Sequence, residues 1–205
     1  CRLDPNTGIG DPTPAFTYCL NLAEVEVDTK TGKTTVLKFT CVDFVGRIGN
    51  IDAVNGQAYS GIMHGIGFAL KEDYADVKKH ANMFGAGTSY IKDVPDDINL
   101  IHIDGAISDG PFGSSGASEA FQASGHCAVL NGIYNACGVR IHEIPALPEK
   151  VKAGLDAIAK GEKPYEPKKY FDMYEELENI KENPVQVGTQ SFYVSLDDPT
   201  AERPF

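Results

Sequence analysis

The chain lacks an apolar run of the roughly 18 residues that a membrane-spanning helix needs. It also lacks a basic segment followed by an apolar stretch at its start, so the sequence predicts no signal peptide. We therefore expect a cytoplasmic protein. The first residue is Cys1 rather than methionine, which leads us to expect either a processed subunit or a fragment of a longer chain.

Clusters of lysine and arginine are also missing. Among 205 residues there are 18 Lys and Arg against 29 Asp and Glu, which gives a formal net charge of −11. Nucleic-acid phosphates and anionic lipid headgroups both require clustered positive side chains. The sequence therefore predicts no nucleic-acid partner and no membrane partner.

Closely spaced metal ligands are absent as well. The five cysteines contain no Cys-x-x-Cys pair, and the five histidines contain no His-x-His or His-x-x-x-His pattern. Zinc and iron–sulfur sites need such spacing, and the cysteine density is too low for a disulfide-based fold. We predict free, buried thiols, structural histidines and no side-chain ligand to a metal. No Gly-x-Ser-x-Gly motif supports a serine hydrolase triad.

Two patterns of apolar residues predict the strands. Hydrophobic residues make up 42% of the chain, which is enough for a folded core. Apolar residues on either side of a turn at 28–33 predict a β-hairpin over 17–45, with both of its faces covered. Shorter apolar runs predict one or two strands within 90–103 and a strand-like piece at 139–141.

Helical spacing predicts three further segments. The first helix starts at Asn50 and continues to about residue 69. The second covers about 119–137 and stops at Gly138, and the third covers 149–160 with Pro148 in its first turn. We expect an α+β fold in which the hairpin sheet packs against these helices.

The C-terminal part of the chain differs in character from the rest. After residue 160, Lys, Glu, Pro and Tyr become frequent. A modest helix is predicted over 171–182, followed by an extended arm over 185–205 with a strand-like patch at 191–196. We expect two parts, a folded region at 1–160 and a tail at 161–205.

The first predicted helix is unusually rich in glycine. Gly56, Gly61, Gly65 and Gly67 all lie within it, although each glycine costs a helix about 1 kcal/mol relative to alanine. Such a helix gains from close approach, either by another backbone or by a ligand. The sequence alone leaves both possibilities open.

A glycine- and serine-rich loop at 113–118 leads directly into the second predicted helix. Backbone N–H groups of such a loop, together with the first amides of a helix, form a concave surface that binds anions. No lysine of a phosphate-binding P-loop follows. Glu119 lies where the loop meets the helix, and there it suits either a general base or ordinary helix-start electrostatics.

Several long motifs resemble the C-terminal region of molybdenum hydroxylases, the xanthine oxidase family, and are most like bacterial aldehyde oxidoreductases. The resemblance covers about residues 3–160. The longest motif is Gly-Pro-Phe-Gly-Ser-Ser-Gly-Ala-Ser-Glu at 110–119, and the segments 131–141 and 145–151 follow it. Earlier in the chain, the matching residues are the stretch 3–8, the hairpin at 24–33, Val45-Gly46-Arg47, Asn50, Val54 and Gly56-Gln57.

The resemblance implies a molybdenum–molybdopterin cofactor, often a cytosine dinucleotide in bacteria, that takes no side-chain ligand from the protein. Glu119 would be the general base in the hydroxylation of an aldehyde to a carboxylic acid with water-derived oxygen. Gln57 would hydrogen-bond the pterin, and the backbone of Ser115, Gly116, Ala117 and Ser118 would contact the cofactor. Residues 1–160 would then be the C-terminal portion of the molybdopterin-binding catalytic domain.

The resemblance also implies partners, because the cysteine pattern of the family's iron–sulfur domains is missing. We expect the remainder of the molybdopterin domain, iron–sulfur domains or subunits, and a small-molecule substrate. Three positions depart from the usual family pattern: Ala117-Ser118 replaces Val-Gly, Asn50-Ile51 replaces Asn-Pro, and His64 replaces Gln. The Ser118 hydroxyl would add a hydrogen bond or cap the helix.

These departures leave the substrate class open between aldehydes and purines or other N-heterocycles. The same residues would also suit a structural subunit that keeps the fold but has lost catalysis. An unrelated α+β domain that binds an anion through the loop at 113–118 would explain the loop, although it would not explain the long ordered motifs.

Overall fold

The computed structural model describes residues 3–10, 15–76, 78–107 and 109–163, together with the backbone of 186–187 and 190–191. The chain divides into two compact units, Cys1 with Asp11–Tyr165, and Arg2–Gly10 with Glu166–Phe205. In the second unit, Leu3 and Gly10 form an antiparallel bridge, and β4 (Gln186–Val187) pairs with β5 (Gln190–Ser191). The predicted helix at 171–182 and nearly all of the patch at 191–196 lie outside the described residues.

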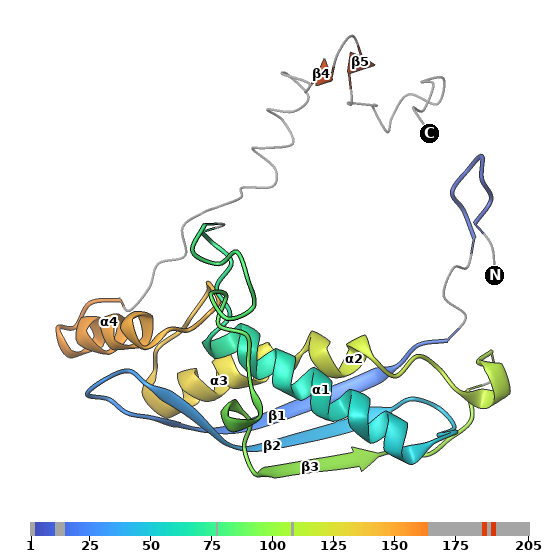
Figure 1. The fold of residues 1–205 in the computed structure, drawn as a ribbon, viewed down its shortest axis with the longest axis horizontal. Coiled ribbons are helices and arrows are strands. Elements are labelled where there is room, and N and C mark those ends of the chain that lie inside the picture. Colours follow the sequence, from blue (N-terminus) through green and yellow to red (C-terminus); the bar gives the residue numbers. More distant parts are fainter. Residues whose placement is uncertain are drawn as a thin grey trace. The chain divides into compact units, whose positions relative to one another are not determined.

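The larger unit is built on a three-stranded sheet with the order β1-β2-β3 (Figure 1). β1 (Tyr18–Val27) and β2 (Thr34–Phe44) form the predicted antiparallel hairpin, in which Tyr18 lies opposite Phe44. β3 (Asp97–His102) lies within the region predicted to contain short strands and pairs in parallel with β2. The two described edges of this sheet are therefore β1 and β3.

The strand predicted at 139–141 is wrong. Those residues form a connection between two helices rather than a strand. Val139 is buried because its side chain packs against Gly154, where an added Cβ would come within 2.5 Å of it. Its apolar character thus reflects helix packing and not strand pairing.

The three predicted helical regions are present. α1 (Ile51–Leu70) begins at Asn50, whose side chain accepts a hydrogen bond from the Ala53 N–H at 3.0 Å. Gly138 ends the second region in a left-handed conformation, as expected. The elements that follow α1 are the short 3-10 turns η1 (Ile91–Asp93) and η2 (Pro111–Gly113), then α2 (Glu119–Ala123), α3 (Gly125–Cys137) and α4 (Pro148–Ala159). None of the described helices is long and apolar enough to cross a membrane.

The predicted single helix over 119–137 is broken at Ser124. A side chain from β1 accounts for the break: the amide of Asn21 donates to the Ser124 hydroxyl at 2.9 Å and to the Phe121 carbonyl at 3.4 Å. These bonds satisfy polar groups that the interrupted helix leaves free. The segment therefore becomes a short α2 that is tied to the sheet, followed by α3.

The helices cover one face of the sheet (Figure 1). The core between them is formed by buried side chains of Phe39, Cys41, Ile62, Ile66, Phe121, Val129 and Ile133. On the opposite face, Tyr18, Leu20 and Leu22 are 66%, 61% and 56% exposed. The prediction that both faces of the hairpin are covered is therefore wrong for the described part of the chain.

The glycines of α1 allow it to lie against α2 and α3. An added Cβ on Gly61 would lie 2.6 Å from the Phe121 Cβ, and one on Gly65 would lie 2.9 Å from the Gly125 Cα. At these two positions the close approach is therefore by another backbone and not by a ligand. At Gly56, by contrast, an added Cβ would meet no atom within 4 Å.

We expect Gly61→Ala to lower the stability of the cofactor-free protein by about 1–3 kcal/mol, since the new methyl group has no room. The matched control is Gly56→Ala, in the same helix, which should raise stability by about 0.5–1 kcal/mol through better helix propensity. Denaturant unfolding of both variants measures the difference. Equal effects of the two substitutions would contradict the packing argument.

Candidate functional site

The loop that precedes α2 is fixed from two sides. The Ser115 N–H donates to the Val45 carbonyl at 2.9 Å, and the Arg47 N–H donates to the Gly113 carbonyl at 2.8 Å. From the start of β1, the Thr17 hydroxyl lies 2.7 Å from the Ser115 hydroxyl and donates to the Gly116 carbonyl. The loop therefore has a defined backbone conformation.

Glycine is required at the point where the segment 45–47 meets this loop. Gly46 has a φ of +73°, and an added Cβ would lie 2.4 Å from the Gly113 carbonyl oxygen. A side chain would be strained at this φ and would also clash with the loop. The Val45-Gly46-Arg47 motif is thus explained by its contact with the loop.

Only part of the predicted anion-binding surface has free donors. The N–H groups of Gly113, Ser114 and Ser115 already donate to carbonyls of Gly110, Pro111 and Val45. In the described part of the chain, the N–H groups at 116–118 meet no acceptor. The surface available to a ligand is therefore narrower than the predicted 113–118.

Glu119 is the first residue of α2, and its side chain is exposed. No described residue offers its carboxylate a hydrogen bond or an ion pair. Ser118 is the N-cap residue, but its hydroxyl makes no capping hydrogen bond, so the predicted cap is wrong. The physical reason is its φ of −109° and ψ of −75°, which differ from the extended conformation of a capping serine.

Gln57 lies on the exposed part of α1. The close contacts between α1 and the following helices join residues that differ by 60 in number, 61 with 121 and 65 with 125. Gln57 lies about one turn before Gly61 in α1, and Glu119 lies two residues before Phe121 in α2. Both residues therefore lie toward the N-terminal ends of the packed helices.

Two glycines at this end have no steric reason to be glycine. Added Cβ atoms on Gly56 and Gly116 would meet nothing within 4 Å, and neither residue is among those with a positive φ. Each lies directly beside a predicted cofactor residue. Bare backbone at these points leaves room for a ligand to approach closely.

A buried polar chain near this end was not predicted from the sequence. The Asp43 carboxylate, 1% exposed, lies 2.7 Å from Nδ1 of His102, and Nε2 of His102 lies 2.7 Å from Oδ1 of Asn55. The three residues join β2, β3 and the second turn of α1, two residues before Gln57. Strand alternation, which places Asp43 on the same face as Cys41 and Val45, was the only indication in the sequence that Asp43 is buried.

Burial raises the pKa of the Asp43 carboxyl above its ordinary value of 3.8, and the hydrogen bond from His102 opposes part of this shift. Oδ1 of Asp43 has no hydrogen-bond partner among the described residues. The hydrogen bonds among Asp43, His102 and Asn55 therefore hold the sheet and α1 together. They leave the buried Oδ1 of Asp43 without a partner among the described residues, which is unfavourable.

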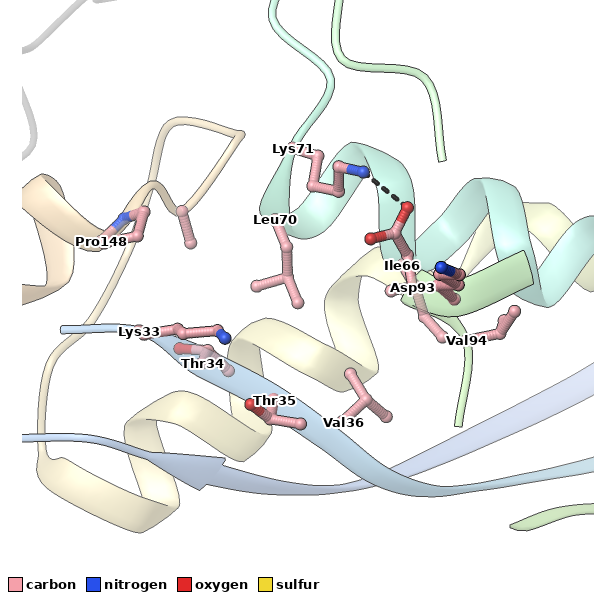
Figure 2. A pocket seen from close by; sticks show the side chains of 12 residues that line it. Lys33, Thr34, Thr35, Val36, Ile66, Leu70, Lys71, Asp93, Val94 and Pro148 are labelled. Atoms are coloured by element: carbon pink, nitrogen blue, oxygen red, sulfur yellow. Dashed lines mark hydrogen bonds and ion pairs between the residues drawn. The ribbon is translucent and has the colours of Figure 1, made fainter. Parts of the chain in front are cut away.

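A cavity of about 380 Å³ lies at the other end of α1. Figure 2 shows Lys71, which forms an ion pair of 2.5 Å with Asp93, on one side and Lys33 and Thr34 on the other. No predicted site residue lines this cavity. It is therefore separate from the end of α1 that carries Gln57.

The prediction of free thiols can be compared with four of the five cysteines. All four are free. Cys41 is buried, Cys19 and Cys137 are half-buried, and Cys127 is exposed. The expected burial is wrong for Cys127, because α3 turns Val129 and Ile133 toward the core rather than Cys127.

We expect Asp43→Asn to change how stability depends on pH. Because the Asp43 pKa is raised, the native state keeps this proton at a pH where the unfolded chain has lost it. The wild type should therefore lose stability relative to the variant as the pH rises from 3.8 through the raised pKa. Unfolding at several pH values, with the exposed Asp97→Asn as a control, measures this. A difference that grows in favour of the wild type would contradict the shift.

The sequence is similar to a known family model and to several known proteins. Residues 2–95 match the family model of a molybdopterin cofactor-binding domain. The aldehyde oxidoreductase of Megalodesulfovibrio gigas is 45% identical over 154 residues, which is 75% of this chain and 17% of that protein. The nicotine 6-hydroxylase large subunit of Paenarthrobacter nicotinovorans is 31% identical over 71% of this chain and 18% of its own length.

The fold is similar to those of solved aldehyde oxidoreductase structures. The aldehyde oxidoreductase from Desulfovibrio gigas superimposes with a TM-score of 0.71 at 44% identity, over 77% of this chain and 17% of that chain. The enzyme from Desulfovibrio desulfuricans gives 0.65 at 50% identity, over 66% and 15%. The chain thus spans about a sixth of the length of these relatives. Its α+β fold is that of their molybdopterin-binding region, and the chain belongs to the molybdenum hydroxylase (xanthine oxidase) family.

Proposed function

We propose that this chain supplies the C-terminal part of the active site in a molybdenum–pterin oxidoreductase that converts an aldehyde to a carboxylic acid. The observation that carries the proposal is the grouping at one end of α1. Gln57 lies in the N-terminal half of α1, and the free amides at 116–118 and the unpaired carboxylate of Glu119 lie where the loop meets α2, which packs against α1. Residues 1–160 would form the C-terminal portion of the catalytic domain, and residues 161–205 a tail.

The residues present fit a pterin cofactor. Its polar ring edge and phosphate need hydrogen-bond donors and acceptors, which the backbone amides at 116–118 and the Gln57 side chain offer. Gly56 and Gly116 leave open backbone on either side, where an added Cβ would meet no protein atom. We propose that Gln57 and the backbone of Ser115, Gly116, Ala117 and Ser118 hold the cofactor, with Ser115 acting mainly by fixing the loop.

When bound, a molybdenum–pterin supplies the two-electron redox chemistry, and the protein supplies orientation and proton transfer. In the proposed reaction, Glu119 would accept the proton from the water whose oxygen enters the substrate. Its carboxylate is exposed and has no hydrogen-bond or ion-pair partner among the described residues, so it is free to act as a general base. The hydrogen bonds from Asn21 hold the C-terminal end of α2 against the sheet.

The exposed outer face of the sheet supports the proposal that the chain acts within a larger unit. Tyr18, Leu20 and Leu22 of β1 form an apolar stripe that no described residue covers. Apolar surface of this kind favours association. We propose that the remainder of the molybdopterin domain covers it, and that iron–sulfur domains or subunits and a small-molecule substrate complete the assembly in the cytoplasm.

The cofactor would be a cytosine dinucleotide.

Hydroxylation of an N-heterocycle is the second candidate activity. Relatives named as a probable hypoxanthine oxidase, 30% identical, and as a nicotine 6-hydroxylase, 31% identical, support it. Both activities need the same base and the same cofactor contacts. Comparing turnover of an aldehyde with that of a purine by the full assembly distinguishes the two.

We expect Glu119→Gln in the full assembly to retain the molybdenum cofactor and to lose turnover by about 10² to 10⁴-fold, since the general base is removed. The matched control is Glu149→Gln, an exposed acidic residue in the first turn of α4. If helix-start electrostatics were the only role of Glu119, the two variants would behave alike. Near-normal turnover of Glu119→Gln at a normal molybdenum content would refute the assignment of Glu119 as the general base.

We expect Gln57→Ala to lower the molybdenum and pterin content of the purified assembly, because a buried polar group of the cofactor loses a hydrogen bond worth about 1–3 kcal/mol. Asp52→Asn, an exposed change in the first turn of the same helix, serves as the control. Metal analysis and pterin fluorescence after release give the readout. Wild-type cofactor content together with wild-type activity would show that Gln57 does not contact the pterin.

A further inference from the structure

We propose that Cys19 and Cys41 form an oxidisable pair that closes to an intrachain disulfide, and that this closure affects the loop and helix that carry Glu119. The two sulfur atoms are 3.4 Å apart. Cys19 lies opposite Asp43, and Cys41 lies opposite Asn21. The two cysteines are therefore diagonal neighbours on the face of the hairpin that meets the helices.

The two thiols have different roles in such a reaction. Cys19 is half-buried and within reach of a small reagent, whereas Cys41 is fully buried. A hydrogen bond from Cys41 lowers the pKa of the Cys19 thiol, although burial opposes the shift. The same hydrogen bond and burial raise the pKa of Cys41. Cys19 is thus the thiol that ionises first and attacks.

A small disulfide is the oxidant in the proposed reaction. The Cys19 thiolate attacks one sulfur of the reagent, which forms a mixed disulfide and releases one thiolate. Cys41 then gives up its proton and displaces the second thiolate from Cys19, so that the Cys19–Cys41 bond forms. Two protein thiols are oxidised, the reagent is reduced to two thiols, and the departing thiolates take the two protons.

The residues on either side of Cys19 bind the predicted active-site loop and the helix that follows it. The neighbours of Cys19 in the alternating burial pattern are Asn21 on β1 and Thr17, which directly precedes β1. Thr17 binds the Ser115 hydroxyl and the Gly116 carbonyl, and Asn21 binds the break between α2 and α3. Bond formation needs the two sulfurs to approach to about 2.05 Å. The resulting shift of β1 would act on both of these hydrogen-bonded anchors.

The first experiment treats the full assembly with 2-hydroxyethyl disulfide without oxygen, blocks the remaining thiols by alkylation, and maps the peptides by mass spectrometry. We expect most of the protein to contain a Cys19–Cys41 link that a thiol reductant removes. Cys19→Ser should lose the link entirely, whereas Cys127→Ser, at an exposed thiol on α3, should keep it. A mixed disulfide on Cys19 without a link to Cys41, or two alkylated thiols, would overturn the proposal.

The second experiment compares amide hydrogen exchange before and after oxidation. We expect exchange over residues 115–123 to rise at least several-fold in the wild type and to be unchanged in Cys19→Ser. A link that forms without any change at 115–123 would overturn the coupling to the loop. Neither readout depends on turnover, so both outcomes are independent of whether the proposed function is correct.

Discussion

The close contact between α1 and the α2–α3 segment is the constraint on which the candidate site depends. At Gly61 and Gly65 the two backbones approach so closely that a single methyl group would not fit. Because this contact sets how α1 lies against α2 and α3, it also orients the N-terminal parts of α1 and α2. Gln57 and Glu119 lie on those parts.

Hydrogen bonds to the sheet also hold the candidate site in place. The loop at 113–118 is bonded to the end of β2 through Val45 and to the start of β1 through Thr17. The Asp43–His102–Asn55 chain joins the same sheet to α1. Each component that carries a predicted cofactor residue is therefore anchored to the hairpin, which makes the hairpin the rigid base of the site.

Much of this arrangement could be predicted from the sequence, because its signals are local. Asn50 as a helix start, Gly138 as a helix stop and the turn at 28–33 depend on residues near one another in the chain. The break at Ser124 could not be predicted, since it depends on Asn21, about a hundred residues away. The same holds for Asp43, whose partners come from two other elements, and for the exposed stripe at Leu20 and Leu22, whose pattern in the sequence is that of a buried strand.

Two sets of long-range pairings in this unit share a spacing of about 60 residues, and this has a consequence for synthesis. Contacts of α1 with α2 and α3 join residues 60 apart, as in 61 with 121, and β2 pairs with β3 through residues such as Lys38 and Asp97. At a translation rate of about 5–20 residues per second, roughly 3–12 seconds separate the emergence of each partner. During that interval the nascent hairpin and the glycine face of α1 are on the ribosome without the segments that pack against them in the folded unit.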